Sequence, residues 1–132
     1  MSRCCYQPLT VEGVALKETW KQCVDWDIRL QEIHEELNEL DRSMDADELR
    51  REKHILEDKL RTLRESVRYQ ISNTPTLSSM ERRVLRLRYL YADPWESIAI
   101  QIKREPSAAF MAHRKALNKV AAYFRFATSV AV

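Results

Sequence analysis

Residues 93–117 read DPWESIAIQIKREPSAAFMAHRKAL, and this stretch contains two helix starts separated by one short turn. Asp93 can cap a helix whose first position is Pro94, because proline lacks the amide hydrogen that would stay unpaired there. Pro106 opens the next helix in the same way. We therefore predict a helix from Pro94 to about Lys103, a short turn, and a second helix from Pro106 onward.

Both helices have a narrow apolar face that can pack against a neighbour. In the first helix this face consists of Ile98, Ala99 and Ile102. The second has a longer face of mostly small residues, namely Ala109, Ala112, Ala116, Leu117 and Val120. Short helices joined by a tight turn, the second packed closely, are the layout in which a helix-turn-helix reads DNA.

A further helix precedes this pair. Ser78 and Glu81 have the spacing of a capping box, in which each side chain binds the backbone N–H of the other residue. The helix is expected to run from Glu81 to Tyr91. Upstream, Thr74 precedes a proline, which disfavours helical geometry at Thr74. We therefore place a boundary here and expect residues 74–132 to form a separate three-helix unit.

Residues 14–73 show two long amphipathic patterns. Apolar residues recur at steps of three and four over residues 16–44, and a second series on one helical stripe follows over residues 49–71. Between them, Asp45 and Glu48 form another helix start, with Asp45 as the N-cap. The pattern predicts an antiparallel, coiled-coil-like hairpin with arms about 40 Å long at ~1.5 Å per residue. One uninterrupted, dimerising helix is the alternative.

Residues 1–13 lack periodicity and include Pro8 and Gly13, so we expect an irregular arm. Gly13 is the only glycine among 132 residues. Hairpin turns of sheets, phosphate-cradling loops and dinucleotide-binding motifs all need glycine. This composition disfavours β-rich folds, P-loop enzymes and Rossmann enzymes. The expected fold class is all-α, with the helical hairpin followed by the helix-turn-helix unit.

The sequence has no recognisable arrangement of catalytic residues. No nucleophile–base pair, metal cluster or phosphate loop is evident, so we expect neither enzyme activity nor a cofactor. Cys4, Cys5 and Cys23 lack the paired spacing of a zinc site or a disulfide framework. The start of the chain has no apolar signal-peptide core, and no segment is apolar enough to span a membrane. We therefore expect a cytoplasmic protein of a bacterial host cell, with reduced thiols.

Charge is segregated along the chain. Residues 21–44 have 3 Lys or Arg against 7 Asp or Glu, whereas residues 74–132 have 10 against 4. The net charge of +2 conceals this difference. The segregation predicts an anionic partner for the C-terminal end alone, and nucleic acid is the leading candidate.

The C-terminal residues also resemble a known family. Residues 87–90 (LRYL), 95–99 (WESIA) and 113–117 (HRKAL) are similar to the C-terminal half of phage and prophage transcription regulators of the ArpU/RinA type. The module in these regulators resembles region 4 of bacterial sigma factors, and the likeness covers residues 77–117. The resemblance implies a sequence-specific transcription regulator. Its third C-terminal helix would enter the major groove of double-stranded DNA, and its second would lie across a phosphate backbone.

The candidate DNA contacts lie around the turn and along the first part of the third helix. Arg114 is expected to reach a guanine edge or a phosphate, and Lys119 to contact phosphate. Trp95 either packs beside a phosphate bound by helix N–H groups or covers the small core. His113 is either a phosphate contact or a core residue. The full set of candidates is Trp95, Lys103, Arg104, Ser107, Ala108, Met111, Arg114 and Lys115. A merely solvated helix face is the alternative.

Three residues depart from the family pattern. The regulators usually have Gly in place of Lys103, at the left-handed end of a helix, and Ser in place of Glu105, and a β-branched core residue is common in place of Ala109. We expect backbone strain at Lys103 and a negative charge near phosphates at Glu105. The alternative function is therefore a protein-interaction factor that binds RNA polymerase or another host or phage protein. A DNA regulator is expected to be a homodimer, because two modules double the phosphate contacts.

Overall fold

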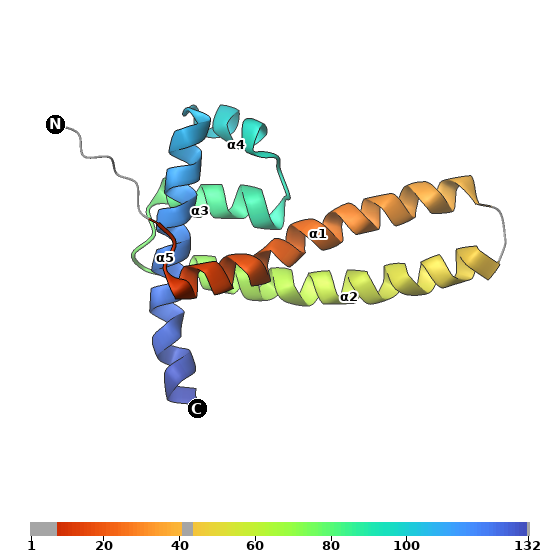
Figure 1. Ribbon diagram of the computed structural model, residues 1–132, viewed down its shortest axis with the longest axis horizontal. Helices are drawn as coiled ribbons and strands as arrows, with labels where there is room; N and C mark the ends of the chain where they lie inside the picture. The colour runs from red at the N-terminus through yellow and green to blue at the C-terminus, as the bar shows by residue number, and fades with distance from the viewer. Residues whose placement is uncertain (1–7, 41–43, 132) are drawn as a thin grey trace.

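A computed structural model of the chain describes residues 8–40 and 44–131. These residues form helices and connecting segments, with no strand among them, so the predicted all-α class is confirmed. Figure 1 shows a long pair of helices and a cluster of helices at one end of the pair. The elements are α1 (Val11–Glu39), α2 (Met44–Ser72), α3 (Ser79–Leu85), a π-helical turn η1 (Arg86–Leu90), α4 (Trp95–Ile102) and α5 (Pro106–Ala131). No helix in the described ranges is long and apolar enough to cross a membrane.

Helices α1 and α2 run in opposite directions side by side, as the hairpin interpretation predicts (Figure 1). Ion pairs cross between them: Arg29 Nε lies 2.6 Å from Glu52 Oε2, and an Arg64 nitrogen lies 3.1 Å from Asp27 Oδ1. Because α2 already begins at Met44, the expected N-cap at Asp45 is wrong, and Asp45 lies within the first helical turn.

Helix α1 begins earlier than the sequence pattern predicts. Thr10 is its N-cap, and the Thr10 hydroxyl accepts a hydrogen bond from the Gly13 N–H at 2.9 Å. Residues 11–13 of the expected arm are thus helical, while residues 1–7 lie outside the described residues. Gly13 is buried where α1 meets α5, and a Cβ there would lie 2.5 Å from Asn118 Oδ1. Close approach to α5 therefore outweighs the propensity cost of a helical glycine, about 1 kcal/mol.

One hydrophobic core joins the base of the hairpin to the C-terminal helices. Trp20 of α1 is 1% exposed, and its ring meets Tyr89 of η1 edge-on with centroids 5.3 Å apart. The buried residues of this core are Trp20, Cys23, Val24, Leu60, Val67, Ile71, Leu77, Leu85, Tyr89, Leu90, Ala116, Leu117 and Val120. The boundary at residue 74 is therefore a change of chain direction and does not divide two separate cores.

Helix α3 has the predicted capping box, but it starts at Ser79, before the expected Glu81, and it also ends differently. The capping box is complete: Glu81 N–H donates to Ser78 Oγ at 3.1 Å, and Ser78 N–H donates to Glu81 Oε1 at 2.8 Å. The expected α-helix to Tyr91 instead changes at Arg86 into η1, where the Tyr91 N–H donates to the Arg86 carbonyl at 3.2 Å.

Helix α4 begins one residue later than predicted. Pro94 has extended backbone geometry, with ψ of 155°, and is the N-cap, so the helix starts at Trp95. The predicted cap at Asp93 is therefore wrong, and its carboxylate accepts a hydrogen bond from Gln101 at 3.0 Å. The predicted buried face of α4 is confirmed. It forms a second small core with α3 and α5, made of Val84, Ile98, Ile102 and Ala109.

Candidate nucleic-acid interface

The first half of α5 presents all five of its predicted contact residues on one side. Helical periodicity places residues three and four apart on the same face. Ser107 and Lys115 are exposed, while Ala108, Met111 and Arg114 are partly exposed. The opposite side faces the interior through Ala109, His113, Ala116 and Leu117. This side of α5 thus presents small residues and the exposed Lys115 to solvent.

The turn before α5 adds two exposed cations, Lys103 and Arg104. Lys103 ends α4 in the left-handed region, with φ of 56° and ψ of 47°, so the strain expected there is present. The Arg104 N–H donates to the Ala99 carbonyl at 3.0 Å, which closes the end of the helix. Glu96 and Glu105 line the hollow beside this turn, so the turn is less positive than the face of α5.

Trp95 fastens the start of α4 to α5. Its ring lies 4.7 Å from the rings of both Phe110 and His113, measured between centroids. The guanidinium of Arg88, from η1, lies over the Trp95 ring, 5.0 Å from its centre. Trp95 also packs against the second core. These contacts favour the core-covering role of Trp95 over direct phosphate binding.

His113 belongs to the interior. It is 4% exposed, and a 2.6 Å hydrogen bond joins its Nε2 to the hydroxyl of Tyr89. Burial lowers the pKa of His113 to about 3, and the nearby charges of Lys17, Arg88 and Arg114 lower it further. The imidazole is therefore neutral near pH 7, which favours the core role over a phosphate contact.

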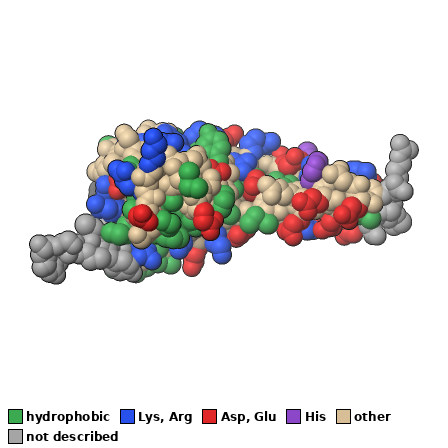
Figure 2. Space-filling view, turned by 90° about the horizontal axis from the view of Figure 1, so that it is seen from above, with side chains coloured by type: hydrophobic (Ala, Val, Ile, Leu, Met, Phe, Trp, Pro, Cys, Tyr) green, Lys and Arg blue, Asp and Glu red, His purple; other side chains and the backbone are tan. Residues whose placement is uncertain are grey.

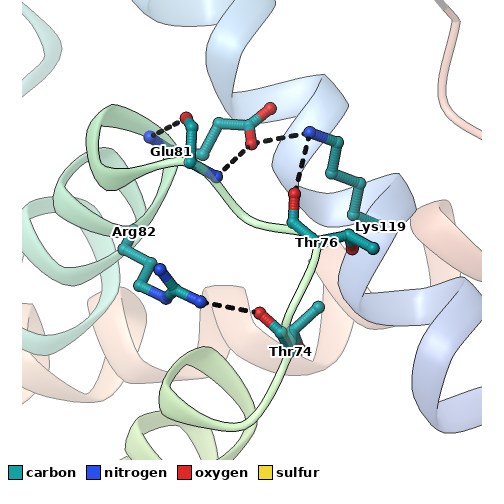
Figure 3. A network of polar contacts seen from close by, with 6 residues as sticks. Thr74, Thr76, Glu81, Arg82 and Lys119 are labelled. Carbon is teal, nitrogen blue, oxygen red and sulfur yellow. Dashed lines mark hydrogen bonds and ion pairs between the residues drawn. The ribbon is translucent and has the colours of Figure 1, made fainter.

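Lys119 has a structural role that its position in the sequence did not reveal. Its ammonium donates to Glu81 Oε1 at 2.8 Å and to the Thr76 carbonyl at 3.2 Å (Figure 3). Nearby, Arg82 donates to the Thr74 carbonyl at 3.0 Å. This ion pair ties α5 to α3, whereas only a phosphate contact was expected at Lys119.

Two cations that the sequence did not select lie near Arg114. A cavity of about 350 Å³ opens between α1, η1, α4 and α5, and Lys17 and Lys21 of α1 line it together with Arg88 and Arg114. Their spacing of four residues was visible in the sequence. Their proximity to α5 was not, because it depends on how the hairpin packs.

The charges separate along the molecule as well as along the chain. In the view of Figure 2, Lys and Arg side chains gather at the end that carries the C-terminal helices, while Asp and Glu side chains are frequent along the hairpin. Among residues 8–40 and 44–131, no three His, Cys, Asp or Glu side chains are grouped so as to hold a metal ion.

Comparison of the chain with protein-family models, curated proteins and solved structures finds no match. Function is therefore inferred from the charge and geometry of the chain itself.

Proposed function

We propose that the protein is a sequence-specific DNA-binding transcription regulator of phage or prophage type. The observation that carries the proposal is the exposed side of α5. Small residues there, Ser107 and Ala108, permit close approach to base edges, and Arg114 can bind a guanine edge with two hydrogen bonds. The turn from α4 holds this helix at the surface, as in proteins that insert a recognition helix into the major groove.

Charge supports the same proposal. Residues 74–132 carry 10 Lys or Arg against 4 Asp or Glu, so the end of the molecule that contains α5 attracts a polyanion. Of the four acidic residues, Glu81 is already paired with Lys119. A homodimer on double-stranded DNA would double the phosphate contacts and strengthen binding at physiological salt.

A second candidate function rests on the hairpin. It projects away from the C-terminal helices (Figure 1), and residues 21–44 carry the acidic excess. Such a surface suits a partner with a basic face. If no duplex binds, this favours a protein-interaction factor that binds RNA polymerase or another host or phage protein.

The test replaces Arg114 with Ala and measures binding to duplexes selected from a random pool. If its guanidinium reads a base, the Arg114→Ala change weakens the selected site by about 1–3 kcal/mol and relaxes preference at one position. Arg51→Ala is the matched control, because it removes the same charge from an exposed position of α2.

Equal losses of affinity for the selected duplex in the two variants would contradict base reading by Arg114. Absence of duplex binding by the folded wild-type protein, even at low salt, would contradict DNA binding altogether and leave the protein-interaction function. Circular dichroism of each protein establishes that it is folded.

A further inference from the structure

The cavity beside Arg114 differs in charge from the other hollows of the molecule. Its cations come from three elements: Lys17 and Lys21 from α1, Arg88 from η1, and Arg114 from α5. None of the described residues that line it is Asp or Glu. Four other hollows, by contrast, each include at least one carboxylate in their lining. This cavity is therefore suited to an anion.

The uncharged part of the lining is aromatic. It consists of Tyr89, Trp95, Phe110 and His113, together with Val24. His113 is buried and bonded to Tyr89, so it supplies a neutral ring and adds no positive charge. Phe110 is 41% exposed, which leaves an apolar ring surface accessible to a ligand.

Arg88 is held in place before any ligand arrives. Its guanidinium lies over the Trp95 ring at 5.0 Å, and its Nη1 donates to the Asp93 carbonyl at 3.0 Å. The exposed Lys17 and Lys21 stand four residues apart, on one side of α1. Cations gathered in one hollow repel each other, and a multivalent anion between them would remove that repulsion.

We propose that this cavity binds a phosphate group. The oxygens of a phosphate accept charge-assisted hydrogen bonds from Arg and Lys side chains, and its charge approaches −2 in monoesters. Two sources offer this chemistry. One is a backbone phosphate of a duplex lying on α5, and the other is a free phosphorylated small molecule such as a nucleotide. The site does not depend on whether α5 reads DNA.

The test uses the full chain and inorganic pyrophosphate as the probe. Calorimetric titration at low ionic strength is expected to show saturable binding to the wild-type protein. The double change Lys17→Gln and Lys21→Gln should weaken it about tenfold, since it removes two charge-assisted contacts. The double change Lys53→Gln and Lys59→Gln removes the same charge from α2 and should leave the affinity unchanged.

Duplex binding by the same variants then identifies the source. If the Lys17→Gln and Lys21→Gln change weakens duplex binding as well as pyrophosphate binding, the cavity holds a backbone phosphate in the DNA complex. If it weakens pyrophosphate binding alone, the natural ligand is a free phosphorylated molecule.

The proposal is overturned if the wild-type protein shows no saturable pyrophosphate binding, or if both double variants bind pyrophosphate equally well. If the proposed DNA function is wrong, the result is different. The protein then binds no duplex, but the two double variants still differ in their affinity for pyrophosphate.

Discussion

At the residue scale, two described non-glycine residues have a left-handed backbone, Ala92 and Lys103, and Lys103 lies at the turn before α5. Its φ of 56° places a side chain where the Cβ crowds the following carbonyl, at a cost of roughly 1–2 kcal/mol. Glycine avoids this crowding and is the usual residue at such a helix end. The chain instead keeps an exposed cation at the turn before α5.

We expect Lys103→Gly to raise the free energy of unfolding by about 0.5–1 kcal/mol, because relief of strain exceeds the added entropy of the unfolded chain. The measurement is urea denaturation. Lys115→Gly is the control of opposite sign, since glycine inside an exposed helical segment costs about 1 kcal/mol. A loss of stability in both variants would show that Lys103 is not strained.

At the scale of elements, one buried carboxylate adds a polar link to the apolar contact between α3 and α5. Glu81 is 5% exposed, and it accepts hydrogen bonds from Lys119 and from the Ser78 N–H. Burial raises the pKa of Glu81, but these hydrogen bonds and the Lys119 charge outweigh it, so the pKa lies below its usual value. The charged form therefore stabilises the fold.

We expect Glu81→Gln to lower the free energy of unfolding at pH 7 by about 1–2 kcal/mol, since it removes charge-assisted bonds. A lowered folded pKa means that the stabilisation is complete above the unfolded pKa of about 4.3 and disappears as pH falls through the folded value. Denaturation of the wild-type protein and of the Glu81→Gln variant between pH 7 and pH 3 should thus show that their difference in free energy of unfolding becomes smaller in acid. The exposed Glu57→Gln change is the control, with little expected effect. A difference independent of pH would contradict the role given to the Glu81 charge.

At the scale of the whole molecule, the hairpin and the C-terminal helices are one folded body. Trp20 shows this directly, because its ring packs on Tyr89 while its Nε1 donates to Gln70 of α2 at 3.2 Å. Removing the hairpin would expose the α5 residues Ala116, Leu117 and Val120, all of which have 0% exposure in the intact chain.

We therefore expect a fragment of residues 74–132 to lack stable tertiary structure, even though the sequence pattern predicts a separate unit there. Leaving three such side chains unburied costs several kcal/mol, at about 25 cal/mol per Å² of apolar surface. Replacing residues 32–49 with a short Gly/Ser turn removes only the distal hairpin and should leave a cooperatively folded protein. Circular dichroism and thermal unfolding measure how well the fragment and the shortened protein fold. A cooperative transition in the fragment would show that the C-terminal helices are independent.

The sequence by itself determined where helices lie and which sides of them are apolar. Capping by Ser78 and the proline start at Pro106 depend on neighbours a few residues away, so they could be predicted. The left-handed end at Lys103 was expected from the family resemblance alone. The predicted face of α5 follows equally from helical periodicity. The start of α4 was wrong because the adjacent residues Asp93 and Pro94 compete for the role of N-cap.

Only the tertiary structure decided which surfaces meet. Lys119 lies 38 residues from its partner Glu81, and the cavity brings Lys17 of α1 beside Arg114 of α5. Gly13 likewise allows α1 to pack closely against α5, and it does not form a turn. A cation on a helix has the same local sequence signal whether it faces water, a buried carboxylate or an anion site. The packing of distant helices sets its surroundings, and with them its role.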